Sequence, residues 1–128
     1  MSRRLLRWTP VVVWMAVIFY MSSLSQLPSV APPTWQEALS NVAHFGEYAV
    51  LGGLLWRALL PLLRQPWPHW AALLIGLLYA VSDEFHQSFV PNRQSSLTDL
   101  AVDAVGLALA QIAVLVWQKR RDRRHLIA

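Results

Sequence analysis

Four of the seven acidic side chains in this chain lie between residues 79 and 106, in the segment YAVSDEFHQSFVPNRQSSLTDLAVDAVG. They are Asp83, Glu84, Asp99 and Asp103. The segments on either side, HWAALLIGLLYAV and LALAQIAVLVW, are almost entirely apolar. Ionisable groups are costly in apolar surroundings, where they are usually paired or functional. Carboxylates in such a setting predict proton transfer or cation binding.

Helical spacing groups these acids with other polar residues. An α-helix turns by about 100° per residue, so residues three or four positions apart share a face. The spacing therefore places Asp83 beside Gln87 on one face and stacks Asp99 on Asp103 on another. An earlier segment, HFGEY, repeats the pattern with three residues, His44, Glu47 and Tyr48. We expect all these side chains to face the interior of a helix bundle.

The elements that must position them are four apolar runs, at about residues 8–27, 43–63, 70–89 and 98–117. Each is close to the roughly 20 residues that a helix needs to cross a bilayer. The chain is 55% hydrophobic and only 14% charged, whereas a soluble domain carries about a quarter charged residues. We therefore predict an all-α fold, an integral membrane bundle of four transmembrane helices. It would form a single domain over residues 1–128, with a basic tail at 118–128.

The positive charges predict the orientation of this bundle. With four spans, the two termini and the middle connection share one side of the membrane, and 10 of the 11 Lys and Arg residues fall there. The positive-inside rule then places both termini in the cytoplasm. All the acids between residues 79 and 106 would lie at the outer leaflet, and we expect the inner halves of the spans to be apolar. The first run resembles a signal peptide, but its length favours an uncleaved helix.

Some of these residues also have simpler structural interpretations. Ser96 and Asp99 fit a capping box, in which Asp99 would only start the fourth helix. Arg93 is expected to pair with the nearby acids. Small residues on two spans should allow close helix contact, namely Ala49, Gly53, Gly106 and Ala110. So little soluble surface argues against nucleic acid as a partner, and the absence of cysteine excludes disulfides.

The same motifs resemble the VanZ-like family, through NVAHFGEYAVLGGLL, the segment at 79–106 and the serine-rich end of the first span. The resemblance covers about residues 19–106 and implies a small multi-span protein of the bacterial cytoplasmic membrane. The family's namesake is associated with resistance to teicoplanin, a lipid-bearing glycopeptide. The motif positions map onto His44, Glu47, Tyr48, Asp83, Glu84, Gln87, Arg93, Asp99, Asp103 and Gly106.

Three functions remain open at this point. The first is an enzyme acting on a lipid or a lipid-linked cell-wall intermediate at the outer leaflet. The second is a proton- or cation-coupled binding or transport module, in which transport would need a homodimer. The third is a structural network serving a partner protein. The candidate catalytic residues are His44, Glu47, Asp83, Glu84 and His86. The candidate substrate-binding residues are Tyr48, Gln87, Arg93, Asp99 and Asp103. A divalent cation is compatible with the carboxylates, and His44 or His86 would also admit Zn²⁺, but the spacing selects no metal.

Overall fold

Four helices form the protein, in a computed structural model that describes residues 3–24, 32–93 and 95–127. They are α1 (Arg3–Ser23), α2 (Pro33–Leu59), α3 (Trp67–Gln87) and α4 (Leu97–Ile127). The predicted all-α class is confirmed, and each predicted span overlaps one helix. The predicted end of the first span, at residues 25–27, lies outside the described residues.

Two helices are longer than their apolar runs. Helix α2 begins at Pro33 rather than near residue 43, because proline is well suited to the first position of a helix and nothing after it breaks the turn. Helix α4 continues through the basic tail to Ile127, since the lysine and arginines there are good helix formers. Hydropathy alone could place neither end, because both extensions consist largely of polar residues.

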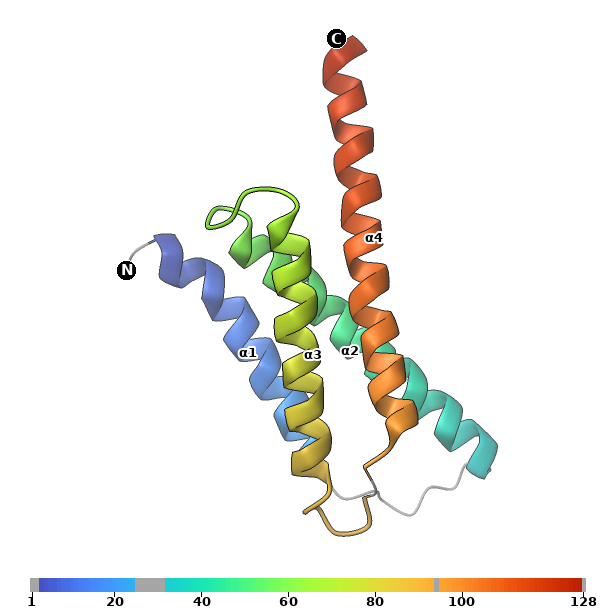
Figure 1. Ribbon diagram of the computed structural model, residues 1–128. Coiled ribbons are helices and arrows are strands. Elements are labelled where there is room, and N and C mark those ends of the chain that lie inside the picture. The colour runs from blue at the N-terminus through green and yellow to red at the C-terminus, as the bar shows by residue number, and fades with distance from the viewer. Residues whose placement is uncertain (1–2, 25–31, 94, 128) are drawn as a thin grey trace.

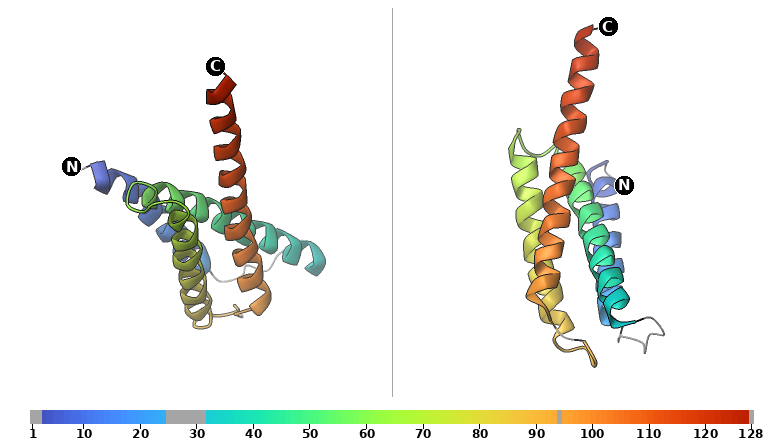
Figure 2. Two further views of the ribbon diagram at one scale, coloured as in Figure 1. Left: turned by 45° about the horizontal axis from the view of Figure 1, so that its top comes forward. Right: turned by 90° about the vertical axis from the view of Figure 1, so that its right-hand side faces the viewer.

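Helix α2 lies at the centre of the arrangement and contacts each of the other three helices. Helix α3 also contacts α4 and α1, whereas α1 and α4 share no contact among the described residues. Both termini and the α2–α3 connection lie at one end of the bundle, and the α3–α4 connection lies at the other (Figure 1). The C-terminal part of α4 projects beyond the remaining helices (Figures 1 and 2).

Close contact between α2 and α4 depends on small residues. A Cβ atom added to Gly106 would lie 2.6 Å from the carbonyl oxygen of Phe45, so only glycine allows this approach. One added to Gly52 would lie 3.2 Å from Cβ of Ala110. The predicted roles of Gly106 and Ala110 are confirmed. The prediction for Gly53 was wrong: a Cβ atom added there would meet no other atom within 4 Å, because its position is turned about 100° from that of Gly52.

Buried polar side chains share the interior of the bundle with an apolar core that includes Tyr48, Leu51 and Leu107, and many other large apolar side chains lie outside. Along α3, Asp83, Glu84 and Gln87 are buried, while Leu78 and Phe85 are 63% and 68% exposed. Apolar surface of this extent is typical of contact with lipid or with another protein. Among the described helices, α1 over Leu5–Ser23 and α4 over Leu97–Arg124 are long and apolar enough to cross a membrane. Helices α2 and α3 do not meet this criterion, and α3 carries four buried polar residues, His69, Asp83, Glu84 and Gln87.

Candidate functional site

Buried acidic side chains gather at the end of the bundle that holds the α3–α4 connection. Asp83 and Glu84 come from the last turns of α3, and Asp103 comes from the second turn of α4. His44 of α2 meets them because α2 crosses α4 at this level. All four side chains are at least nine-tenths buried. We call these four residues, His44, Asp83, Glu84 and Asp103, the polar centre. The apolar helices therefore hold a group of polar side chains in the interior of the bundle.

His44 and Asp103 form the central pair. Nδ1 of His44 lies 3.0 Å from Oδ1 of Asp103, and the two side chains are 7% and 0% exposed. The close approach of Gly106 to the backbone of Phe45 brings the pair together, because Asp103 lies one helical turn before Gly106 and His44 immediately precedes Phe45. The second carboxylate oxygen of Asp103 is buried and has no hydrogen-bond partner among the described residues.

Asp83 accepts hydrogen bonds from three other residues through a single oxygen, Oδ2. The hydroxyl of Ser22 donates at 2.7 Å, the amide of Gln87 at 3.2 Å and the hydroxyl of Tyr48 at 3.5 Å. Oδ1 of Asp83 is buried without a partner in the described part of the chain. This network joins α1, α2 and α3 below the central pair.

Glu84 connects the end of α3 to the start of α4. Its Oε2 accepts the backbone N–H of Ser96 at 2.8 Å, whereas its Oε1 is buried and unpartnered among the described residues. The predicted capping box is therefore only half right. The hydroxyl of Ser96 does cap α4, accepting the N–H of Thr98 at 3.1 Å. Its own N–H, however, goes to Glu84 and not to Asp99.

Among the described residues Arg93 makes no ion pair with an acid, contrary to the prediction. Its guanidinium donates to the carbonyls of Met21 and Leu24 at 3.2 and 3.1 Å, and to the side-chain oxygen of Gln87 at 3.4 Å. The last carbonyls of a helix lack intrahelical partners and carry partial negative charge, so they attract a cation. Arg93 thus ties the α3–α4 connection to the end of α1.

A cavity of about 150 Å³ adjoins these residues, and we call it the polar cavity. It lies between α1, α2 and the α3–α4 connection. Glu47 lines it with a half-buried carboxylate that has no hydrogen-bond partner among the described side chains. The full lining consists of Met21, Ser22, Ser40, Ala43, His44, Glu47 and Arg93.

Two predicted site residues lie apart from this centre. The ring of His86 stacks on Phe19, with 4.2 Å between ring centroids, on the side of α3 that faces α1. Asp99 is half-buried and lines a separate cavity of about 310 Å³ between the first turns of α2 and α4. The other predicted residues belong to the hydrogen-bonded centre or to the polar cavity beside it. They are His44, Glu47, Tyr48, Asp83, Glu84, Gln87, Arg93 and Asp103.

Comparison with known families agrees with the motifs. The chain matches the model of the VanZ/LLP1 family over residues 6–118. It belongs to the VanZ/LLP1 family. Searches of curated proteins and of solved structures return no match to it. The matched range of this VanZ/LLP1 protein contains every residue of the polar centre and of the polar cavity, and it ends where the basic extension of α4 begins.

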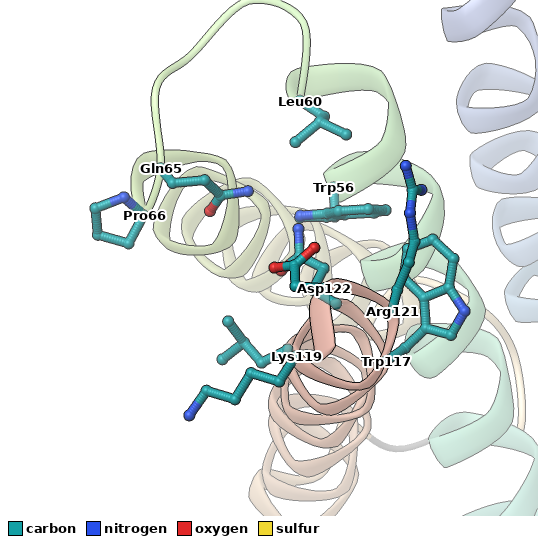
Figure 3. Close-up of a pocket in the computed structure, with 10 residues that line it drawn as sticks. Trp56, Leu60, Gln65, Pro66, Trp117, Lys119, Arg121 and Asp122 are labelled. Atoms are coloured by element: carbon teal, nitrogen blue, oxygen red, sulfur yellow. The ribbon is translucent and has the colours of Figure 1, made fainter. Parts of the chain in front are cut away.

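A larger cavity of the VanZ/LLP1 chain lies elsewhere. It measures about 780 Å³ and lies at the opposite end of the bundle, near the α2–α3 connection and the basic part of α4 (Figure 3). Trp56, Trp117 and Arg121 line it, and none of the predicted site residues does. Size alone would therefore select a different site from the one that the acidic residues indicate.

Two groups of buried polar residues were not predicted from the sequence. Ser22 donates the shortest hydrogen bond to Asp83, and only the serines that end the first span pointed to it. The expectation that the opposite halves of the spans are apolar was wrong. There Nδ1 of His69 lies 2.9 Å from the side-chain oxygen of Gln111, whose amide donates to the carbonyl of Gly52 at 3.0 Å. A single histidine and a single glutamine, 42 positions apart, gave no periodic signal.

Proposed function

We propose that the polar cavity binds the anionic head group of a lipid, or of a lipid-linked molecule of the cell envelope. The observation that carries this proposal is the lining of the cavity. Arg93 supplies a guanidinium, His44 an imidazole and Ser40 a hydroxyl, whereas the hydroxyl proton of Ser22 is already donated to Asp83. These are the donors that bind phosphate and carboxylate groups in proteins.

The size of the cavity fits part of a ligand. A water molecule occupies about 30 Å³ in the liquid, so a cavity of about 150 Å³ accepts a group the size of a few waters. That is suited to a phosphate with one attached group, while the lipid chains would remain outside. The carboxylate of Glu47 complements a head group that also carries hydroxyl or ammonium donors.

The proposal includes a membrane protein with four spans and both termini in the cytoplasm. Apolar side chains exposed along α2 and α3 support it, such as Val42 at 68% and Leu74 at 60%. The two helices would hide their polar residues inside the bundle and present these side chains to lipid. The distribution of Lys and Arg then favours the outer leaflet for the polar cavity.

His44 also suits this site for an acid–base step. Its Nδ1 is engaged by Asp103, which fixes the orientation of the ring and leaves the other ring nitrogen for proton transfer. A His–Asp pair beside a bound head group is therefore compatible with enzymatic as well as binding activity. Unpartnered oxygens on Asp83, Glu84 and Asp103 favour a site over a closed structural network, in which buried polar atoms would be satisfied.

Lipid retention by purified protein tests the proposal. Ala43 lines the polar cavity, so Ala43→Leu should fill it without removing a hydrogen-bonding group. Ala38→Leu is the matched control, because Ala38 is an exposed residue of the same helix and does not line the cavity. Native mass spectrometry in detergent would compare bound phosphatidylglycerol with bound diacylglycerol, which lacks the charged group.

We expect the wild type and Ala38→Leu to retain phosphatidylglycerol, and Ala43→Leu to lose it. The same variant should lose any effect of the protein on teicoplanin sensitivity in cells. Equal retention of both lipids by all three proteins would contradict head-group binding in this cavity.

A further inference from the structure

Three buried side chains from three helices bring their donor atoms together at one point. They are His44 of α2, Glu84 of α3 and Asp103 of α4. One ligand atom of each lies within 4.8 Å of the corresponding atoms of the other two. The residues are 5%, 8% and 0% exposed, so the group lies inside the bundle, and His44 alone among the three lines the polar cavity.

Two oxygens in this group lack a partner. Oε1 of Glu84 and Oδ2 of Asp103 are buried and accept no hydrogen bond from the described residues. Buried polar atoms in native proteins are nearly always satisfied, so each exception needs an explanation. Leaving such an oxygen unpaired is especially costly when it belongs to a carboxylate.

The protein itself supplies too little positive charge to balance these acids. Across the described ranges, the contact of His44 with Asp103 is the single ion pair. Arg93, the nearest basic residue in sequence, is engaged by backbone carbonyls and by Gln87. A divalent cation would provide both the missing charge and the missing partner for the two oxygens.

We infer that His44, Glu84 and Asp103 bind a divalent transition-metal ion. One imidazole nitrogen and two carboxylate oxygens are ligands that Zn²⁺, Mn²⁺ and Fe²⁺ accept, whereas Ca²⁺ and Mg²⁺ prefer oxygen alone. Donor atoms within 4.8 Å of one another can reach metal–ligand distances of about 2.0–2.2 Å through small shifts of the side chains. The ion would replace the direct contact between Nδ1 of His44 and Oδ1 of Asp103.

The surroundings of the group are suited to metal binding. Ser96 holds the other oxygen of Glu84 through its backbone N–H, and this kind of second contact orients the ligands of metal sites. Three protein ligands leave a coordination position open, as in catalytic zinc sites. The role of the ion rests on the proposed function, because His44 also lines the polar cavity, where an open position would accept a head-group oxygen.

Metal analysis of the purified protein tests the inference. The full chain, without a histidine tag, would be purified in detergent and analysed for bound metals by mass spectrometry. We expect about one divalent transition-metal ion per chain. After chelation, added Co²⁺ should give a visible absorption spectrum typical of nitrogen and oxygen ligands, and added Zn²⁺ should raise the melting temperature.

Variants of the same shape identify the ligands. Glu84→Gln combined with Asp103→Asn should weaken metal affinity by more than about 100-fold, since loss of even a supporting contact typically costs 10- to 100-fold. Asp83→Asn is the matched control, because Asp83 is equally buried but is not one of the three residues, and it should keep the metal. Elution of each variant as a single species on gel filtration shows that it is folded.

Wild-type protein that contains no metal, and gives neither a Co²⁺ spectrum nor a melting shift, would overturn the inference. So would a double variant that binds metal as tightly as the wild type. Failure of the proposed function is a separate result: metal would be bound as expected, while phosphatidylglycerol retention would not respond to Ala43→Leu.

Discussion

Gly106 of α4 lies so close to the backbone of Phe45 in α2 that a Cβ atom there would be 2.6 Å from the carbonyl oxygen. This contact fixes the distance between the two helices at the level of the polar centre. One position before Phe45 is His44, and three positions before Gly106 is Asp103. The 3.0 Å contact between His44 and Asp103 therefore depends on the absence of a side chain at Gly106.

Gly106→Ala should therefore destabilise the protein. The added methyl group meets a backbone oxygen rather than a flexible side chain, so the helices must separate. Overpacking of this kind typically costs about 1–3 kcal/mol. Gly53→Ala is the control, because a Cβ atom added at Gly53 meets no other atom within 4 Å and alanine is the better helix former. Melting temperatures in detergent should fall for Gly106→Ala only; an equal fall in both variants would contradict the account.

The sequence was sufficient to predict the helices and most of the residues of the polar centre. Apolar runs located four helices, and spacing along them placed His44, Asp83 and Asp103 on inward faces. The sequence could not predict the contacts between distant segments. Whether Glu84 or Asp99 would bind the N–H of Ser96 depends on how α3 ends beside α4, which spacing within one helix does not specify.

Arg93 illustrates the same limit. A lone arginine near several acids predicts an ion pair, because charge is the only property that sequence makes visible at that position. The carbonyls of Met21 and Leu24 compete for it only once α1 ends next to the α3–α4 connection. Every residue has a backbone carbonyl, so the sequence alone could not predict which carbonyls Arg93 would bind.

Neutralising an acid of the centre should separate function from stability. In Glu84→Gln the side-chain oxygen can still accept the N–H of Ser96, while one of several crowded negative charges is removed. In metal-free protein we expect an unchanged or higher melting temperature, together with loss of phosphatidylglycerol retention and of any effect on teicoplanin sensitivity. A large fall in stability, matched by a proportional fall in function, would indicate a structural network instead.

The pair of His69 and Gln111, at the other end of the bundle, should contribute to stability but not to lipid binding. Gln111→Leu removes the partner of His69 and leaves a buried ring nitrogen unsatisfied. The expected cost is about 1–3 kcal/mol of stability. Lipid retention, measured below the melting temperature of the variant, should remain at the wild-type level. Loss of retention without loss of stability would extend the functional site to this end.

Cysteine labelling tests the four-span topology directly, since the chain has no native cysteine. Ser95→Cys lies in the exposed α3–α4 connection and should react with an impermeant thiol reagent in intact cells. Gln118→Cys lies in α4 beyond the predicted span and should react only after the cells are opened. The reverse pattern would place the polar cavity on the cytoplasmic side.

The location of the bound head group is the central claim, and photo-cross-linking measures it most directly. A phosphatidylglycerol analogue with a diazirine beside the phosphate would be activated in membranes that contain the protein, and the modified residues would be mapped by mass spectrometry. The account predicts modification around Ser40, Ala43 and Glu47, and its loss in Ala43→Leu. Modification confined to the large cavity around Trp56 and Trp117, and unaffected by Ala43→Leu, would contradict it.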